Sequence, residues 1–350
     1  MHPAAPQASL FESPEEHAPP PTAPAPAPPK ARSESGDLIA ADPGAELLAL
    51  AGRLSPLVRF GTSSWYFPGW TGLVWGRDYA PSTLSRRGLT AYSRHPLLRC
   101  VSLDRSFYRP LEAATYADLA GQVPPGFRFV VKAPSLVTDA TVRNPDNGKA
   151  TSPNPLFLDG PSATDLFVRP ALQGMGEALG VLVFQLSPLT LDWLSRPQAL
   201  LERLDTMFAT VRAAVATGTC RPLVALEIRD GELLGPELAA LLKRHEVRYC
   251  LGLHDRMPPI EAQLPMLRAL WPGPLVCRWN LLRGLKYEQA RKRFEPFDRM
   301  QAPDPDTRHV LAKVVAATAL AGHEVYVTIN NKAEGSAPLS VFELAKAVLS

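Results

Sequence analysis

The sequence contains no apolar run that approaches the roughly 20 residues needed to cross a membrane as a helix. Its first residues lack the basic start and apolar core of a secretory signal. The four cysteines lie far apart and form no Cys-x-x-Cys pair, so neither a zinc site nor a dithiol redox motif is indicated. These absences argue against a membrane or secreted protein and predict a cytoplasmic protein with reduced, mostly buried thiols.

Net charge is also low, at +3 over 350 residues. The first 56 residues hold seven acidic and three basic side chains, which is −4 and leaves +7 of the total for the remainder. A surplus of this size is typical of a soluble surface, and it also suits a small anionic ligand. It does not guarantee the broad basic surface that a long duplex needs, and no nucleic-acid recognition motif is present. Nucleic acid is therefore a less favoured partner than a small anion.

Proline is abundant at the start of the chain. Ten of the 37 prolines lie in the first 30 residues, including the stretch APPPTAPAPAPPK. Proline removes backbone donors, and alanine and proline offer little apolar area to offset the entropy of ordering. We therefore predict a disordered tail over residues 1–45, a short helix within 45–54, and one globular domain over residues 46–350.

From residue 57 onward, short apolar or β-branched runs alternate with helical segments. Strands that alternate with helices predict a parallel sheet, and eight such units in about 290 residues predict a (β/α)8 barrel of TIM type. An open, doubly wound sheet is the alternative, but no glycine-rich phosphate-binding turn follows the first run. The predicted strands cover residues 57–63, 98–104, 127–133, 180–186, 222–228, 247–253, 274–280 and 324–330.

Functional side chains of such a barrel gather where the strands end, at its C-terminal face. In this sequence the strand interiors are Val, Leu, Phe and Ile, and polar or charged residues stand at or just beyond the strand ends. The candidate site residues at these ends are Ser63, Trp65, Asp104, Tyr108, Lys132, Gln185, Glu227, Arg229, His254, Asp255, Arg278, Asn280, Asn330 and Asn331.

Several of these segments resemble the DUF72 family, the YecE-like proteins. The stretch FGTSSWYFPGWTGLVW is similar to the family's Gly-Thr-Ser-Gly-Trp and Trp-x-Gly opening. SFYRP and FRFVVK are similar to its Phe-Tyr-Arg and Phe-x-Phe-x-x-Lys segments, ALEIRD contains its Glu-x-Arg, and NNKAEGSA its Asn-Asn-x-x-x-Gly-x-Ala close. The resemblance spans residues 57–350. It implies a TIM-type barrel and a set of site positions rather than a reaction.

The chain departs from the family pattern in three places. Ser102 and Asp104 stand where the family has Glu-x-Asn, and Asp139 replaces a His that usually follows the Lys segment. The segment 139–166 is also longer and more polar than the family norm. These departures favour a member that keeps a binding pocket without the family's chemistry, as one of the alternatives below.

Aromatic residues crowd into the first loop at the predicted active face. Trp65 and Tyr66 could form an apolar wall and stacking platform for a planar or sugar-like ligand. The alternative is that this segment packs a loop onto the barrel, and we favour packing for Trp70 and Trp75. Gly61 precedes the cluster and allows close approach of the backbone.

Charged residues at the strand ends suggest particular roles. Lys132 could bind an anion, act as a base or form a Schiff base, or it could pair structurally with an acid. Glu227 and Arg229 lie two apart, so their side chains share a face of the strand, as an acid/base with its orienting cation or as a structural ion pair. Asp255 is a second candidate acid, beside His254.

Arg278 lies within a strand near the end of the barrel where phosphate is often held, and arginine suits bidentate recognition of phosphate. Asn280, Asn330 and Asn331 could hydrogen-bond a polar ligand without adding charge.

Three functions fit these residues. The first is a metal-independent enzyme acting on a small anionic, phosphorylated substrate, with Glu227 as general acid/base and Lys132, Arg229 and Arg278 stabilising negative charge. The second is a metal-dependent phosphodiester hydrolase. The scarcity of histidine at the strand ends allows one Mg²⁺ or Mn²⁺ rather than a multi-metal centre. The third is a non-catalytic binding module. We favour the first and predict no bound cofactor.

Overall fold

The computed structural model describes residues 38–144 and 150–350. Most of the predicted disordered tail, residues 1–37, lies outside the described residues. Residues 38–41, which the composition assigned to the tail, lie against the first loop. Leu38 is buried, Ala40 bridges to Trp75, and the Ala41 backbone N–H donates to the Val74 carbonyl at 2.9 Å. The packed part of the chain therefore begins earlier than predicted, because apolar side chains follow the proline-rich stretch.

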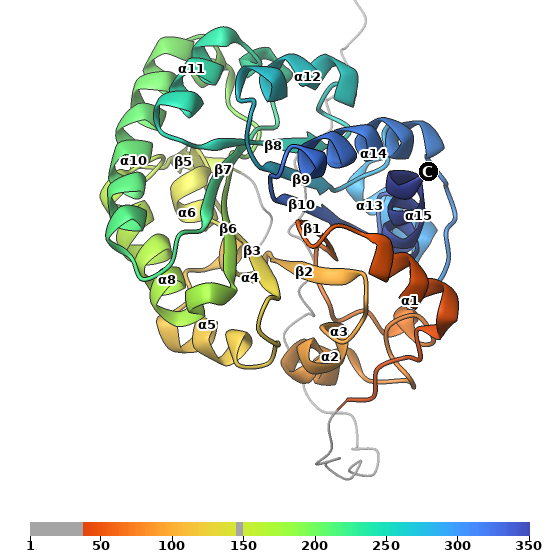
Figure 1. Cartoon of the computed structure of the whole chain (residues 1–350). Helices are drawn as coiled ribbons and strands as arrows, with labels where there is room; N and C mark the ends of the chain where they lie inside the picture. Colours follow the sequence, from red (N-terminus) through yellow and green to blue (C-terminus); the bar gives the residue numbers. More distant parts are fainter. Residues whose placement is uncertain (1–37, 145–149) are drawn as a thin grey trace, which may run out of the picture.

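The central feature is a closed barrel of eight parallel strands, which confirms the predicted fold (Figure 1). Each strand falls on one of the eight predicted runs. Because the first strand pairs with both the second and the last, the sheet closes on itself and is not an open doubly wound sheet. In barrel order the strands are β1 (Val58–Thr62), β10 (Val325–Ile329), β9 (Leu275–Trp279), β8 (Arg248–Leu253), β7 (Leu223–Glu227), β6 (Leu179–Gln185), β3 (Arg128–Lys132) and β2 (Leu98–Leu103).

Helices surround the barrel, and helical segments lie between the strands along the chain as the alternation predicted. The apolar faces of these helices pack on the outer side of the barrel strands. The helices are α1 (Gly44–Arg53), α2 (Pro81–Arg87), α3 (Leu89–Tyr92), α4 (Arg105–Tyr108), α5 (Ala113–Ala120), α6 (Ser135–Thr138), α7 (Gly160–Ala163), α8 (Arg169–Met175), α9 (Leu191–Leu194), α10 (Pro197–Thr217), α11 (Pro236–Arg244), α12 (Ile260–Ala269), α13 (Tyr287–Phe294), α14 (Pro305–Leu320) and α15 (Ala337–Leu349).

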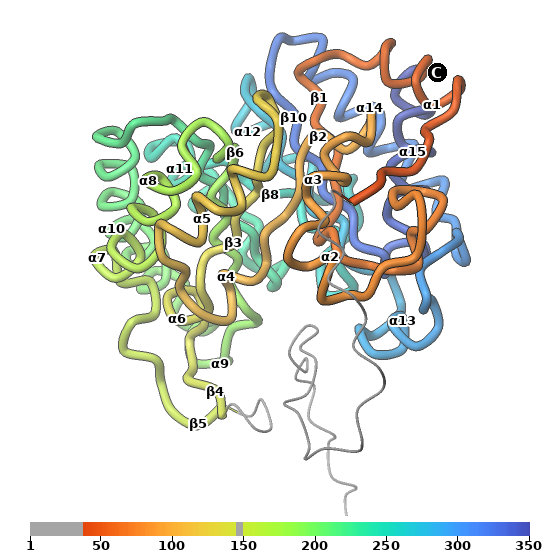
Figure 2. Tube along the Cα trace, turned by 90° about the horizontal axis from the view of Figure 1, so that it is seen from below, coloured from red at the N-terminus to blue at the C-terminus, as the bar shows by residue number. Residues whose placement is uncertain are grey.

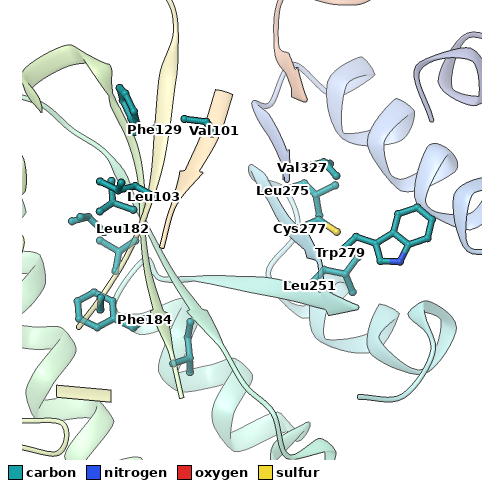
Figure 3. Close-up of a cluster of buried hydrophobic side chains, with 14 of the residues drawn as sticks. Val101, Leu103, Phe129, Leu182, Phe184, Leu251, Leu275, Cys277, Trp279 and Val327 are labelled. Atoms are coloured by element: carbon teal, nitrogen blue, oxygen red, sulfur yellow. The ribbon is translucent and has the colours of Figure 1, made fainter. Parts of the chain in front are cut away.

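Alternate residues of each strand divide between two apolar cores, as the period of two requires. The outward positions form the large core between strands and helices, as Figure 3 shows for Leu103, Phe184 and Trp279. The inward positions form a smaller core inside the barrel, on the N-terminal side of the polar residues at the strand ends. Its members are Cys100, Val130, Val181, Val183, Ala225, Cys250, Val276 and Tyr326.

A small hairpin projects from the barrel on the side where α4, α6 and α9 follow their strands (Figure 2). It consists of β4 (Thr141–Arg143) and β5 (Ala150–Pro153), which pair antiparallel. These strands occupy the longer polar segment recognised in the sequence, at the C-terminal face of the barrel.

All four cysteines are buried and unbridged, in agreement with the prediction. Burial raises the pKa of the thiols of Cys100, Cys250 and Cys277 well above the usual value, so they remain protonated and unreactive. Among the residues that the structure describes, no helix combines the length and the apolar character that a membrane crossing requires.

Candidate functional site

A layer of polar side chains lies beyond the inner apolar core, towards the C-terminal ends of the strands. The side chains of the two layers share the inward face because every second residue of a strand points to the same side. Two residues beyond Cys100, Val130, Val183, Ala225 and Val276 come Ser102, Lys132, Gln185, Glu227 and Arg278. All five of these polar residues are buried. Burial of this many polar groups is costly unless they bond to one another. All of these residues except Ser102, with their neighbours at the strand ends, form a group that we call the charged cluster. Its members are Asp104, Lys132, Gln185, Glu227, Arg229, Arg278 and Asn280.

Arg278 is the hub of the charged cluster. Its Nη1 donates to Glu227 Oε2 at 2.7 Å and to Gln185 Oε1 at 3.0 Å. Its Nη2 donates to both carboxylate oxygens of Asp104, at 2.9 and 3.0 Å. The side chain is only 2% exposed and joins the ends of β2, β6 and β7 to β9 across the barrel. Both terminal nitrogens of the guanidinium predicted to bind a ligand are therefore already bonded to the protein.

Glu227 is fully buried and is surrounded by donors. Besides Arg278, Asn280 Nδ2 donates to its Oε1 at 3.0 Å, and Arg229 Nη1 lies 2.9 Å from the same oxygen. Burial alone would raise the pKa of this carboxyl. The charges of Arg229, Arg278 and Lys132 and the Arg278 hydrogen bond outweigh burial and lower the pKa from 4.5 to about 2. Glu227 is therefore ionised at neutral pH.

Arg229 lies beside Glu227 and is less completely bonded than Arg278. Its Nη2 donates to Gln185 Oε1 at 3.0 Å, so Gln185 Oε1 accepts from both arginines. The residue is 5% exposed, and its Nε has no acceptor among the described residues. Gly252 on the neighbouring strand leaves room here, since an added Cβ would lie 3.6 Å from Glu227 Oε1 and 3.8 Å from Arg229 Nη1.

Lys132 closes β3 and is 4% exposed. Its Nζ lies 3.5 Å from the centroid of the Phe107 ring, and its charge contributes to the low pKa of Glu227. The Lys132 carbonyl accepts from Ser106 Oγ at 2.6 Å, which links β3 to α4 after β2. A cation held over an aromatic face is stabilised by the ring quadrupole.

Two residues that depart from the family pattern, Ser102 and Asp139, have different surroundings. Ser102 Oγ donates to Asp104 Oδ1 at 2.8 Å, so the serine supports the carboxylate that binds Arg278. Asp139 instead accepts from Arg143 Nε at 3.0 Å, at the base of the β4–β5 hairpin.

His254 and Asp255 form a second group with Lys286. His254 Nδ1 lies 2.8 Å from Asp255 Oδ1, and Lys286 Nζ donates to Asp255 Oδ2 at 3.0 Å. Burial opposes ionisation of Asp255, but these two partners outweigh it and lower its pKa far below the usual range. His254 also lines a small cavity of about 20 Å³ whose lining does not include Glu227. Arg256 lies between this pair and Arg229, since its backbone N–H donates to His254 Nδ1 and its Nε donates to the Arg229 carbonyl, both at 3.3 Å.

The aromatic loop after β1 packs onto the barrel. Trp70 and Trp75 are fully buried and stack at 6.4 Å between ring centroids, which confirms their packing role. Trp65 is 2% exposed, and its indole N–H donates to the Leu84 carbonyl at 3.2 Å. Its ring therefore lies inside the fold, and its contact with a ligand stays a prediction. Gly61 permits the close approach predicted for it, since a Cβ there would lie 2.0 Å from the Cys100 carbonyl oxygen.

The remaining candidates lie around this layer. Asn331 accepts from the Trp70 indole N–H at 3.1 Å and from the Ala337 N–H at 2.8 Å, and so holds the last loop in place. Asn330 accepts from the Lys332 N–H at 3.0 Å. Ser63 is buried. The Tyr108 ring packs edge-on against Phe107, 5.6 Å between centroids. Ligand contacts by these four residues remain predictions.

Sequence reasoning missed two buried acids, Asp230, which accepts from the Leu189 N–H at 2.9 Å, and Glu334. Glu334 is fully buried in the loop after β10, and its Oε1 accepts from the Asp304 N–H at 2.7 Å, before α14. Burial raises its pKa. The sequence signal that could have identified Glu334 is its position four residues after Asn330, just beyond the end of β10. A cavity of about 340 Å³ lies outside the charged cluster, lined by Met300, Pro303, Arg308, Leu339, Phe342 and Glu343.

The architecture and these contacts define a class: a (β/α)8 barrel protein with a buried charged cluster at the C-terminal end of its strands. The chain belongs to the DUF72 family, described as proteins of unknown function, whose sequence model matches residues 59–350. This confirms the resemblance seen in the motifs.

Two solved structures of DUF72 family proteins are similar to this chain. One, from Enterococcus faecalis, is 16% identical with a TM-score of 0.54, and the alignment covers 84% of this chain and 96% of that one. The other, from Thermotoga maritima, is 17% identical with a TM-score of 0.53, over 84% and 99% of the two chains. At this level of identity the likeness shows the fold alone. No curated protein matches the chain.

Proposed function

We propose that this protein binds a small anionic, phosphorylated substrate at the C-terminal end of the barrel, with Arg229 as the principal anion-binding group. The observation that carries the proposal is the incomplete hydrogen bonding of its guanidinium group. Arg229 is 5% exposed, its Nε has no acceptor among the described residues, and its Nη1 makes only the ion-pair contact with Glu227. A buried guanidinium with unmet donors attracts oxyanions, because its planar fork matches phosphate and carboxylate oxygens.

The charge balance of the cluster supports the same proposal. Three cations, Lys132, Arg229 and Arg278, face two carboxylates, Asp104 and Glu227, so one positive charge is in surplus. Charges interact more strongly in a buried layer than at an exposed surface, because water screens them less. A bound anion would neutralise that surplus.

Arg278 and Glu227 are assigned positioning roles in this proposal. The terminal nitrogens of Arg278 are occupied by Asp104, Gln185 and Glu227. With a pKa of about 2, Glu227 is a weak base at neutral pH. The carboxylate is suited to orienting Arg229 rather than to transferring protons.

The metal-dependent alternative receives less support from the donor set. Among the residues that the structure describes, no group of three or more His, Cys, Asp or Glu side chains is placed to hold a metal ion. The carboxylates of Asp104 and Glu227 are bonded by arginines, whose charges would repel a divalent cation.

The test is a thermal-shift titration of the full chain with inorganic phosphate and with small phosphorylated metabolites. A ligand at 100 times its dissociation constant adds about 2.7 kcal/mol to the free energy of unfolding. We expect Arg229→Gln to lose this ligand-induced shift. Arg283→Gln, which changes an exposed arginine in the loop after β9, is the matched control and should keep it. Equal shifts in wild type and Arg229→Gln, or no shift with any phosphorylated compound, would contradict the proposal.

A further inference from the structure

Burial separates two lysines from all others in the described part of the chain. Lys132 is 4% exposed and Lys332 is 2% exposed, whereas the remaining described lysines are exposed. Burying an ammonium group is unfavourable unless it is paired or has a function. The two positions can therefore be compared directly.

Lys332 has an aromatic environment in the loop after β10. Its Nζ lies 4.2 Å from the centroid of the Tyr287 ring and 6.0 Å from that of Phe297. Its backbone carbonyl also accepts from the Leu282 N–H at 2.9 Å. These contacts join two loops and give Lys332 a structural role.

Lys132 contacts an aromatic ring and interacts electrostatically with the charged cluster. Its Nζ lies 3.5 Å from the Phe107 centroid, and its charge acts on Glu227. Among the three cations of the cluster, Lys132 alone can release a proton, because guanidinium groups stay protonated. Release leaves two arginines facing two carboxylates, a neutral set. The two arginines and two carboxylates around Lys132 offset one another, and its burial favours the neutral, nucleophilic amine.

We propose that Lys132 is a catalytic nucleophile that forms an imine with the carbonyl carbon of a small phosphorylated aldehyde or ketone, whose phosphate is held by Arg229. This inference rests on the proposed function, since the phosphate must bind there. The neutral amine adds to the carbonyl carbon and gives a carbinolamine. The C–O bond then breaks, and the oxygen leaves with the two amine protons as water. The C=N bond replaces the C=O bond without any oxidant or reductant.

The test traps this imine on the full chain. Wild type is incubated with glycolaldehyde phosphate, treated with sodium borohydride to reduce the imine to a stable secondary amine, and analysed by peptide mass mapping. Glycolaldehyde, which lacks the phosphate, is the matched probe. We expect the mass increment on the peptide that carries Lys132 with glycolaldehyde phosphate, and its loss with glycolaldehyde. Lys132→Arg should lose the increment, and Lys332→Arg should retain it.

Increments confined to exposed lysines, or equally frequent on Lys132 and Lys332, would overturn the inference. Mapping on wild type decides this even if Lys132→Arg does not fold. Inorganic phosphate in the thermal-shift titration separates the two claims. A phosphate shift without trapping at Lys132 refutes the imine and leaves the anion site standing, whereas loss of both refutes the proposed function as well.

Discussion

The carboxylate of Glu227 makes a quantitative prediction, because its partners are all in the buried layer. In Glu227→Gln the side chain keeps its shape and one acceptor oxygen, but Arg278 and Arg229 lose their shared counter-charge. The lowering of its pKa from 4.5 to about 2 corresponds to about 3 kcal/mol of stability at neutral pH, at 1.36 kcal/mol per pKa unit. Breaking a buried pair by removing one partner costs a similar ~3–5 kcal/mol.

The sign of the pH dependence follows from the direction of that shift. A carboxyl whose pKa is lowered by folding contributes stability above its unfolded pKa of about 4.5. The contribution disappears as the pH falls through the folded pKa of about 2. The difference in unfolding free energy between wild type and Glu227→Gln should therefore be largest near neutral pH and should shrink in acid.

Urea denaturation followed by circular dichroism, repeated from neutral pH down into this acidic range, measures the difference directly. Glu202→Gln changes an exposed carboxyl of α10 and is the matched control, for which we expect little effect at any pH. A pH-independent difference for Glu227→Gln, or a variant as stable as wild type at neutral pH, would refute the ion-pair reasoning.

Three further predictions concern packing and buried groups. Gly61→Ala should lower the free energy of unfolding by about 1–3 kcal/mol or more, since its Cβ would overlap the Cys100 carbonyl oxygen, and denaturant titration measures the loss. Gly52→Ala in α1 has open space around the added Cβ and should be neutral or slightly stabilising, so equal effects would count against this view. Burial raises the pKa of Glu334, so its contribution to stability is lost as the pH rises through the folded value. Glu334→Gln should therefore be more stable than wild type at neutral pH, with an advantage that shrinks in acid; a melting temperature below wild type at neutral pH would show that its charge is needed. The four buried thiols should react with a thiol reagent only as fast as the protein unfolds, and rapid labelling of the native chain would disprove their burial.

Local patterns predicted the barrel well. Each of the eight strands is a short run of apolar and β-branched residues, and such runs between amphipathic helices leave few arrangements that bury both faces. Composition placed the start of the domain at residue 46, but Leu38 is already buried. The difference arose because residues 39–41 bond to a loop more than 30 residues further along the chain.

The site was predicted in part, and the physical reason lies in the strand period. Glu227 and Arg229, two apart on β7, could be assigned to one face from the sequence, and Arg278 could be placed on β9. Their mutual contacts could not be predicted, because the hydrogen bonds of Arg278 cross the barrel to Asp104, Gln185 and Glu227.

The order of strands and helices and the polar character of the strand ends were predictable from the sequence, because they follow from periodicities of two and 3.6 along the chain. Tertiary structure alone decided which polar residues meet. It bonded Asp104 and Glu227 through Arg278, left the Nε of Arg229 without an acceptor among the described residues, and paired Asp255 with His254 and Lys286 instead. The shape of the closed barrel and the side-chain conformations set those distances, and both depend on contacts between residues that are far apart in the sequence.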